Sequence, residues 1–227
     1  MLITGFAAGP LAANCYVVAT APDAECVVID PGQRAVDPLR DVLTEHRLRP
    51  AAVLVTHGHF DHVMCAAAVC AEFGAPVYLG AGDVPMLSGQ LRALSPEFRA
   101  SMTMFLGPGE DLDDLRPDEI LPLGGGEHLR VAGLDIDALA VPGHTPGSIT
   151  YRLAMDSGEP DVLFTGDTLF AGTIGRSDLP GGSPSRILES IAAELLSLPD
   201  ETAVLPGHGE TTTIGAERRG NPFLAGL

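Results

Sequence analysis

Four side chains of metal-binding types stand close together in the segment Thr56-His57-Gly58-His59-Phe60-Asp61-His62. His57 and His59 follow an apolar run, where an extended backbone points alternate side chains the same way, so both can contact one ion. Asp61 and His62 come at the start of the next predicted helix, where neighbouring side chains diverge and can contact a second ion. Burying four such groups together without an ion would be costly. The segment therefore predicts a metal site.

Three later segments share one pattern, in which an apolar strand runs into Gly or Pro and then presents a metal-binding side chain. They are Leu139-Ala140-Val141-Pro142-Gly143-His144, Val162-Leu163-Phe164-Thr165-Gly166-Asp167 and Ala203-Val204-Leu205-Pro206-Gly207-His208. Glycine lets the backbone turn sharply and approach a bound group. If these strands share an edge with residues 51–55, all seven donors meet on one rim.

These five histidines and two aspartates suffice for two divalent ions, with a bridging carboxylate and one open position for each ion. Open positions indicate catalysis and disfavour the alternative of a metal-binding module without activity. Zinc suits the donor set best, although iron or manganese also accept such ligands. His46 and His128 lack the pattern and are expected at the surface.

The charge of the chain restricts its partners. Its 227 residues include 30 acidic and 13 basic side chains, a formal net charge of −17, and such a field repels phosphate backbones and anionic membranes. All basic residues are arginine, which excludes Schiff-base chemistry on lysine. We expect a small-molecule substrate, no nucleic acid, no membrane, and a monomer or homodimer.

The elements that position the donors are short apolar runs separated by Gly and Pro. The sequence contains no internal repeat and no long linker. Strands are predicted at 27–29, 51–55, 77–79, 134–138, 149–153, 162–164 and 203–205, and helices at 36–47, 63–73 and 185–198. The order of elements over 51–79 is typical of a βαβ unit. We expect one domain, residues 1–227, of the α/β class: an αββα sandwich of two mixed sheets with helices on both outer faces.

Residues 83–106 are predicted to be helical, with an apolar face that includes Met86, Leu91, Leu94 and Phe105. Such a face is typical of a core element, and a lid over the site or a dimer contact are open alternatives. The acidic segment from Glu110 to Glu119 is interpreted as a solvated loop.

The four cysteines form no Cys-x-x-Cys pair, so reduced, buried thiols are expected instead of a zinc ribbon or a disulfide framework. The first residues carry no basic stretch, and glycine and proline interrupt them before an apolar run could form a secretion signal. No segment approaches transmembrane length. We therefore expect a cytoplasmic protein.

The His-x-His-x-Asp-His motif, the later His144, Asp167 and His208, and the Asp30-Pro31-Gly32 turn together resemble the metallo-β-lactamase superfamily across essentially the whole chain. The resemblance implies that His57, His59 and His144 hold one metal, that Asp61, His62 and His208 hold another, and that Asp167 bridges them. It also implies that Asp30 supports a ligand imidazole from behind.

Within this superfamily, the segments Gly166 to Phe170 and Ile174 to Gly182 and the ending around Asn221-Pro222-Phe223 look like the short glyoxalase II-like (hydroxyacylglutathione hydrolase-like) group. The resemblance implies hydrolysis of a 2-hydroxyacyl thioester, such as S-lactoylglutathione or another thiol's equivalent, by a metal-bridging hydroxide that Asp61 orients. Longer glyoxalase II enzymes use a C-terminal helical domain to hold glutathione, and too few residues follow His208 to form one. Arg176 is the candidate for binding a substrate carboxylate, with a structural loop role as the alternative.

Two other activities stay open at this point. Persulfide dioxygenases resemble the same group and share its Gly-Arg-(Ser/Thr)-Asp stretch, but they use one iron held by the equivalents of His57, His144 and Asp167. Lactone-cleaving relatives share a phenylalanine at the position of Phe60, although the Arg176 loop argues against a lactonase. The commonest exported β-lactamases place a cysteine at the position of Asp167, which argues against antibiotic hydrolysis.

Overall fold

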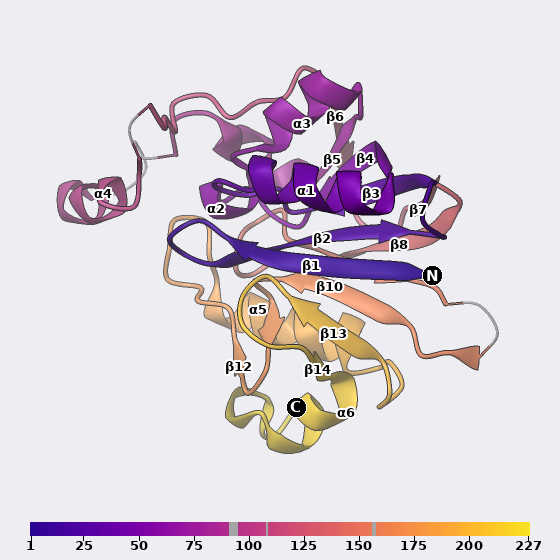
Figure 1. Cartoon of the computed structure of the whole chain (residues 1–227). Coiled ribbons are helices and arrows are strands. Elements are labelled where there is room, and N and C mark those ends of the chain that lie inside the picture. The colour runs from indigo at the N-terminus through magenta and orange to yellow at the C-terminus, as the bar shows by residue number, and fades with distance from the viewer. Residues whose placement is uncertain (91–94, 108, 156–157) are drawn as a thin grey trace.

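Two sheets lie face to face in the computed structural model, with helices on the outer side of each (Figure 1). The structure describes residues 1–90, 95–107, 109–155 and 158–227. The first sheet has the strand order β1-β2-β3-β4-β5-β6, and the second has the order β14-β13-β10-β9-β8-β7. The predicted αββα class is confirmed, and each large sheet comes from one contiguous part of the chain.

The first part of the chain supplies one sheet and its helices. Its strands are β1 (Leu2–Ala8), β2 (Ala13–Ala19), β3 (Glu25–Ile29), β4 (Arg49–Val55), β5 (Val77–Gly80) and β6 (Ile120–Leu123). The first three strands pair antiparallel, and the pairs from β3 to β6 are parallel. The helices are α1 (Val36–His46), α2 (Phe60–Val63), α3 (Ala66–Phe73), the 3₁₀ helix η1 (Ala81–Leu87) and α4 (Pro96–Thr103).

The second part supplies the other sheet. Its strands are β7 (His128–Val131), β8 (Leu134–Ala140), β9 (Ile149–Leu153), β10 (Val162–Gly166), β13 (Ala203–Pro206) and β14 (Thr212–Thr213), and a separate ribbon pairs β11 (Leu169–Phe170) with β12 (Thr173–Ile174). The helices are α5 (Pro184–Ser190), which continues into the π-helical turn η4 (Ile191–Leu195), α6 (Ile214–Gly220) and the short η5 (Pro222–Leu224).

Strand β3 shows why the predicted strands are continuous apolar runs. Cys26 and Val28 join the hydrophobic cluster between the first sheet and its helices, whereas Val27 and Ile29 join the cluster between the two sheets. Because both faces of the strand are covered, no polar alternation is needed. A third cluster packs the second sheet against α5, η4 and α6.

Strands β1 and β2 are missing from the predicted elements, although they form a long antiparallel pair at the edge of the first sheet. In β2 the run Cys15 to Ala19 is buried on both faces. Glycine and proline residues interrupt the apolar pattern of this region, so the sequence did not predict a strand there. The partner of β2 is β1, which lies in the same interrupted stretch.

The predicted helix over 83–106 is wrong in its middle. Helix η1 ends at Leu87, and the backbone N–H of Leu115 donates to the Leu87 carbonyl while Gly89 donates to Asp113. This pairing with a distant segment replaces helical hydrogen bonds, and α4 begins only at Pro96. Residues 91–94, with Leu91 and Leu94 of the predicted face, lie outside the described residues.

Residues 110–119 form a loop whose carboxylates at 111, 113, 114, 118 and 119 are exposed, as expected, but its apolar residues are buried. Leu112 and Leu115 are buried at 1% and 5% exposure and join the outer hydrophobic cluster. The Glu110 carboxylate pairs with Arg34 and accepts a hydrogen bond from Gln33. The segment is therefore docked on the first sheet despite its acidic composition.

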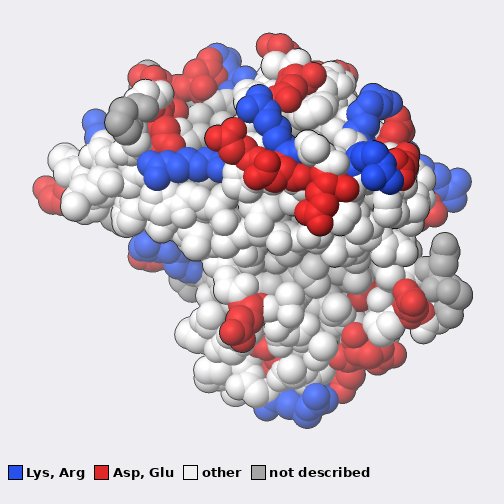
Figure 2. Space-filling model, in the orientation of Figure 1, with Lys and Arg blue, Asp and Glu red and all other residues white. Residues whose placement is uncertain are grey.

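Acidic and basic side chains alternate over the helices of the first outer layer, as Figure 2 shows. There Arg40 of α1 pairs with Glu72 of α3 at 2.7 Å, a contact on the surface that contributes little to stability. Among the described residues, no helix combines the length and apolarity needed to span a membrane.

Tyr151 links the two sheets beside the metal-binding segment, because its buried hydroxyl donates to the Val55 carbonyl at 3.0 Å. Tyr151→Phe removes this donor, so we expect the free energy of unfolding to fall by about 0.5–1.5 kcal/mol in urea denaturation. The control is Tyr78→Phe, a partly buried tyrosine packed on the same cluster. An equal loss in both variants would contradict a specific role for the Tyr151 hydroxyl.

Candidate metal centre

The seven donors singled out in the sequence meet at one end of the two sheets. They follow four different strands: His57 and His59 come after β4 and lead into Asp61 and His62 of α2, while His144, Asp167 and His208 come after β8, β10 and β13. Half-buried His46 and exposed His128 take no part, and His128 pairs with Asp135 and Asp137.

The donor atoms form three overlapping groups, and within each group they lie within 4.8 Å of one another. The groups are His57-His59-His144, His57-His62-Asp167 and Asp61-His62-His208. Asp167 lies between the outer two groups, because its Oδ2 is 3.7 Å from Nε2 of both His144 and His208. This arrangement has room for two ions with one carboxylate between them.

The ring nitrogens are crowded in a way that a cation would relieve. Nε2 of His144 lies 3.2 Å from Nε2 of His57 and 2.9 Å from Nδ1 of His59. The buried Oδ1 of Asp167 makes no hydrogen bond with the described residues, and its close polar neighbour is Nε2 of His62 at 3.3 Å. Buried acceptors are rarely left unpaired, and imidazole and carboxylate are ligands for divalent ions. The donor set therefore fits divalent metal.

Acceptors behind the rings decide which nitrogen faces the centre. Nδ1 of His62 lies 2.9 Å from Asp30 Oδ2, Nδ1 of His144 lies 2.6 Å from the Arg176 carbonyl, and Nδ1 of His208 lies 3.0 Å from the Leu11 carbonyl. Each Nδ1 can donate its proton outward, which leaves the Nε2 lone pair for an ion.

Asp30 also holds the strand end that carries the first two histidines. Its carboxylate accepts hydrogen bonds from the backbone N–H and the hydroxyl of Thr56, at 2.7 and 2.6 Å. The residue has a left-handed backbone, with φ 49°, which is uncommon for a side chain other than glycine. The turn is therefore shaped to bring one carboxylate to two metal-binding segments.

The same turn interrupts the helix that carries Asp61 and His62. A continuous helix would pair the Cys65 N–H with the Asp61 carbonyl, but Cys65 donates to Pro31 and Asp61 accepts from Gln33. The predicted helix over 63–73 corresponds to α3 from Ala66 on, and its first residues lie at the end of α2 and in the break between the two helices. Gly32 permits this contact, because a Cβ there would lie 1.6 Å from the Asp61 carbonyl oxygen.

Burial and nearby charges shift the pKa values of the donor histidines in different directions. Burial lowers the pKa of His57 well below its usual value and that of His59 to about 4, so both rings are neutral. Burial acts in the same direction on His62, but the carboxylates of Asp167 and Asp61 outweigh it and raise the pKa of His62. Burial tends to raise the pKa of Asp61, and His62 and its neighbours lower it instead.

Asp83 is a buried residue beside the centre that sequence reasoning missed. It is fully buried, and its carboxylate accepts hydrogen bonds from Gly58 N–H at 2.8 Å, Gly147 N–H at 2.6 Å and the Thr145 hydroxyl at 2.6 Å. It thus joins the loop of His57 and His59 to the loop of His144. No local motif surrounds Asp83, so its sequence context gave no indication of this position.

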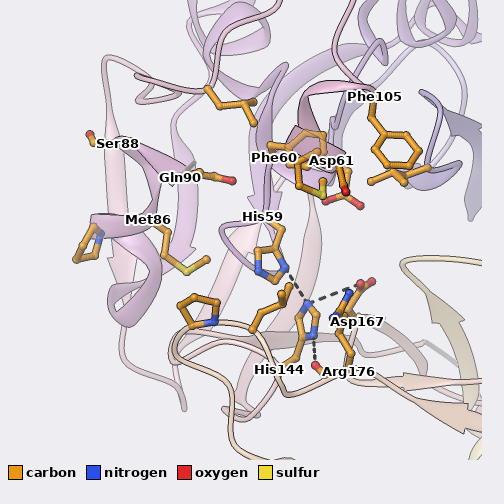
Figure 3. A pocket seen from close by; sticks show the side chains of 18 residues that line it. His59, Phe60, Asp61, Met86, Ser88, Gln90, Phe105, His144, Asp167 and Arg176 are labelled. Carbon is orange, nitrogen blue, oxygen red and sulfur yellow. Dashed lines mark hydrogen bonds and ion pairs between the residues drawn. The ribbon is translucent and has the colours of Figure 1, made fainter. Parts of the chain in front are cut away.

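A pocket of about 560 Å³ opens onto the centre, within the range of roughly 300–1,000 Å³ for small-ligand sites. His59, Asp61, His144 and Asp167 line it, and Figure 3 shows His59, His144 and Asp167 pointing toward one another. Arg176 also lines it, but its guanidinium pairs with Asp178 at 2.8 Å. The contact of Arg176 with the centre is made by its backbone carbonyl.

Comparison with known proteins identifies the family. The model of the metallo-β-lactamase superfamily matches residues 8–208. The chain belongs to the metallo-β-lactamase superfamily. Members of this superfamily are mostly hydrolases and bind divalent metal ions, in agreement with the clustered donors of this chain.

Two relatives show the range of similarity. An uncharacterised protein of Mycobacterium tuberculosis is 46% identical over 229 residues, which cover 100% of this chain and 99% of that protein. Hydroxyacylglutathione hydrolase GloC of Haemophilus influenzae is 35% identical over 211 residues, which cover 93% of this chain and 92% of GloC.

Three solved structures share the fold over nearly the whole chain. The BLEG-1 B3 metallo-β-lactamase has a TM-score of 0.82 and 35% identity, covering 99% of this chain and 100% of that one. TTHA1623 in a di-iron-bound form has a TM-score of 0.79 and 37% identity, covering 97% and 100%. ETHE1 from Myxococcus xanthus has a TM-score of 0.77 and 27% identity, covering 100% and 85%.

The position of Asp83 gives a prediction. Asp83→Asn turns one acceptor oxygen into a donor that faces N–H or O–H groups, so we expect a loss of about 1–3 kcal/mol in unfolding free energy and about 10–100-fold weaker metal binding. Urea denaturation and metal titration measure the two effects. The control is Asp37→Asn, whose side chain is 93% exposed; metal binding equal to that control would refute the role of Asp83.

Proposed function

We propose that the protein is a metal-dependent hydrolase that cleaves a thioester, with a 2-hydroxyacyl thioester such as S-lactoylglutathione, or another thiol's equivalent, as the substrate class. One observation carries the proposal: Asp167 lies between the group that contains His144 and the group that contains His208, and a pocket of small-molecule size opens onto them. The 35% identity with a hydroxyacylglutathione hydrolase over most of both chains supports the thioester.

The proposed ligands are His57, His59 and His144 for one ion, and Asp61, His62 and His208 for the other, with Asp167 between them. We propose zinc as the native metal because it suits mixed imidazole and carboxylate donors, although a relative at 37% identity holds two irons. Bound there, the ions would supply Lewis acidity to the substrate carbonyl and to the attacking water.

Asp61 is the proposed catalytic residue. Its carboxylate lines the pocket, and its lowered pKa keeps it ionised. It can therefore accept a hydrogen bond from the attacking water and direct the oxygen lone pair toward the thioester carbon. A C–O bond forms, the C–S bond breaks, and the sulfur takes up the proton that the water gives up, so the products are a carboxylic acid and a thiol.

The described lining offers no cysteine that could act as a nucleophile. Cys15, Cys26 and Cys70 are buried in the outer hydrophobic cluster, and half-buried Cys65 packs against it. Burial raises the pKa of Cys26 to about 12 and raises that of Cys15 well above its usual value. Direct attack by water is therefore the favoured route.

Arg176 remains the proposed substrate-binding residue. Its side chain is exposed at the edge of the pocket, where Asp178 holds its position. Because the pair is exposed, a substrate carboxylate can compete with Asp178 for it at low cost. The formal charge of −17 supports a small-molecule partner instead of nucleic acid or an anionic membrane. The free thiols support the proposed cytoplasmic location.

Metal depletion is the first test. A chelator should abolish turnover of S-lactoylglutathione and lower the melting temperature, because bound metal stabilises only the folded state. Zinc should restore both properties, with two equivalents bound by mass spectrometry. Parallel assays with a chromogenic β-lactam and a lactone test the rival hydrolases, since one similar structure is a B3 metallo-β-lactamase. A single bound iron with oxygen uptake on a thiol persulfide would establish the dioxygenase instead.

Asp61→Asn tests the proposed catalytic residue. The amide keeps the shape of the side chain but loses the charge, so we expect kcat to fall about 10²–10⁴-fold while the circular dichroism spectrum is retained. Asp37→Asn, on the exposed face of α1, should keep full activity. Retention of wild-type kcat by Asp61→Asn would exclude this role.

A further inference from the structure

Three apolar side chains on the pocket wall are not part of any hydrophobic core cluster. Met86 from η1, Phe105 after α4 and Leu179 after β12 line the pocket, each partly exposed. None of the three belongs to the clusters that hold the sheets and helices together. In Figure 3, Met86 and Phe105 lie on either side of His59. Their apolar surface is therefore available to a ligand.

Three polar side chains of the described wall, those of Gln90, Ser101 and Arg176, are hydrogen-bonded within the protein. The Gln90 amide donates to the Gly58 carbonyl at 2.5 Å, and the Ser101 hydroxyl donates to the Glu97 carbonyl at 3.2 Å. Arg176 makes two hydrogen bonds to Asp178, both at 2.8 Å. A ligand group that hydrogen-bonded to Gln90 or Ser101 would have to compete with these bonds, whereas an apolar group would only displace water.

The described lining also offers few partners for a ligand that carries two anionic groups. Arg176 is the one cationic side chain of the described lining, and the adjacent Asp178 carboxylate offsets it. A glutathione thioester carries two carboxylates, and for these the described wall provides at most one partner that is already paired.

We propose that the substrate is a thioester with an uncharged apolar chain, and that Met86, Phe105 and Leu179 bind this chain above the metal centre. The proposal rests on the proposed thioester hydrolysis and narrows its substrate class. Methionine adapts its shape to irregular apolar ligands, which suits a flexible chain. The chain belongs either to the acyl group or to the thiol, since both flank the same carbonyl, and turnover distinguishes the two.

Inert thioethers test the binding of the chain without turnover. S-ethyl, S-butyl and S-hexyl N-acetylcysteamine are titrated into the metal-loaded protein by calorimetry. Each buried methylene contributes about 0.8 kcal/mol, so affinity should rise up to about four-fold per methylene. S-methylglutathione and a hexyl chain that ends in a carboxylate should bind more weakly than S-hexyl N-acetylcysteamine. Equal affinity along the series, or tighter binding of S-methylglutathione, would overturn the proposal.

Substitutions test whether the apolar pocket wall causes the dependence of affinity on chain length. Met86→Ala and Phe105→Ala should each reduce the increase in affinity to about two-fold per methylene, because part of the apolar surface is removed. The matched control is Met104→Ala, in the same segment as Phe105 but 85% exposed and absent from the described lining. Met104→Ala should keep the wild-type gain. An unchanged gain in both wall variants, with melting temperatures preserved, contradicts the assignment.

Turnover identifies the side of the thioester that carries the chain. One series lengthens the acyl group on N-acetylcysteamine, and the other lengthens the thiol of S-lactoyl esters. kcat/KM should rise with length in one series and stay level in the other. Hydrolysis of all the thioesters at rates that do not depend on chain length would contradict the apolar binding site but would still support thioester hydrolysis. Binding that depends on length, with no hydrolysis in either series, would refute the hydrolase and retain the apolar site.

Discussion

The close approach of buried imidazole and carboxylate groups is the constraint on which this structure depends. Facing ring nitrogens of His57, His59 and His144 lie only 2.9–3.2 Å apart, at the base of an open pocket. The rings of His62, His144 and His208 are each held in one orientation by an acceptor behind Nδ1. The sharp turn of Asp30 and the loop contacts of Asp83 serve this requirement.

The donors were predictable from the sequence because their pattern is local. Two histidines at a spacing of two residues after an apolar strand, and three repeats of strand, glycine and ligand, identify all seven side chains. The layered architecture was predictable for a related reason: strands covered on both faces, such as β3, have continuous apolar sequences. The roles of the donors in binding metal stay predictions until an ion is measured.

Contacts between distant segments were not predictable. Asp83 lies 25 residues from Gly58 and 62 from Thr145, and only the folded chain shows that its carboxylate joins them. The apolar pattern of residues 83–106 favoured one helix, but backbone pairing of Leu87 with Leu115 outweighs that local preference. The acidic composition of 110–119 likewise concealed two buried leucines.

The division of the chain into two contiguous sheets gives the metal centre a second consequence. Every donor group with three ligands takes residues from both parts: His144 joins His57 and His59, Asp167 joins His57 and His62, and His208 joins Asp61 and His62. A metal ion bound at any of these donor groups would therefore link the two parts of the chain. During synthesis the first half emerges with its donors incomplete, and His208 arrives last. Loading with metal would thus report that both halves have docked.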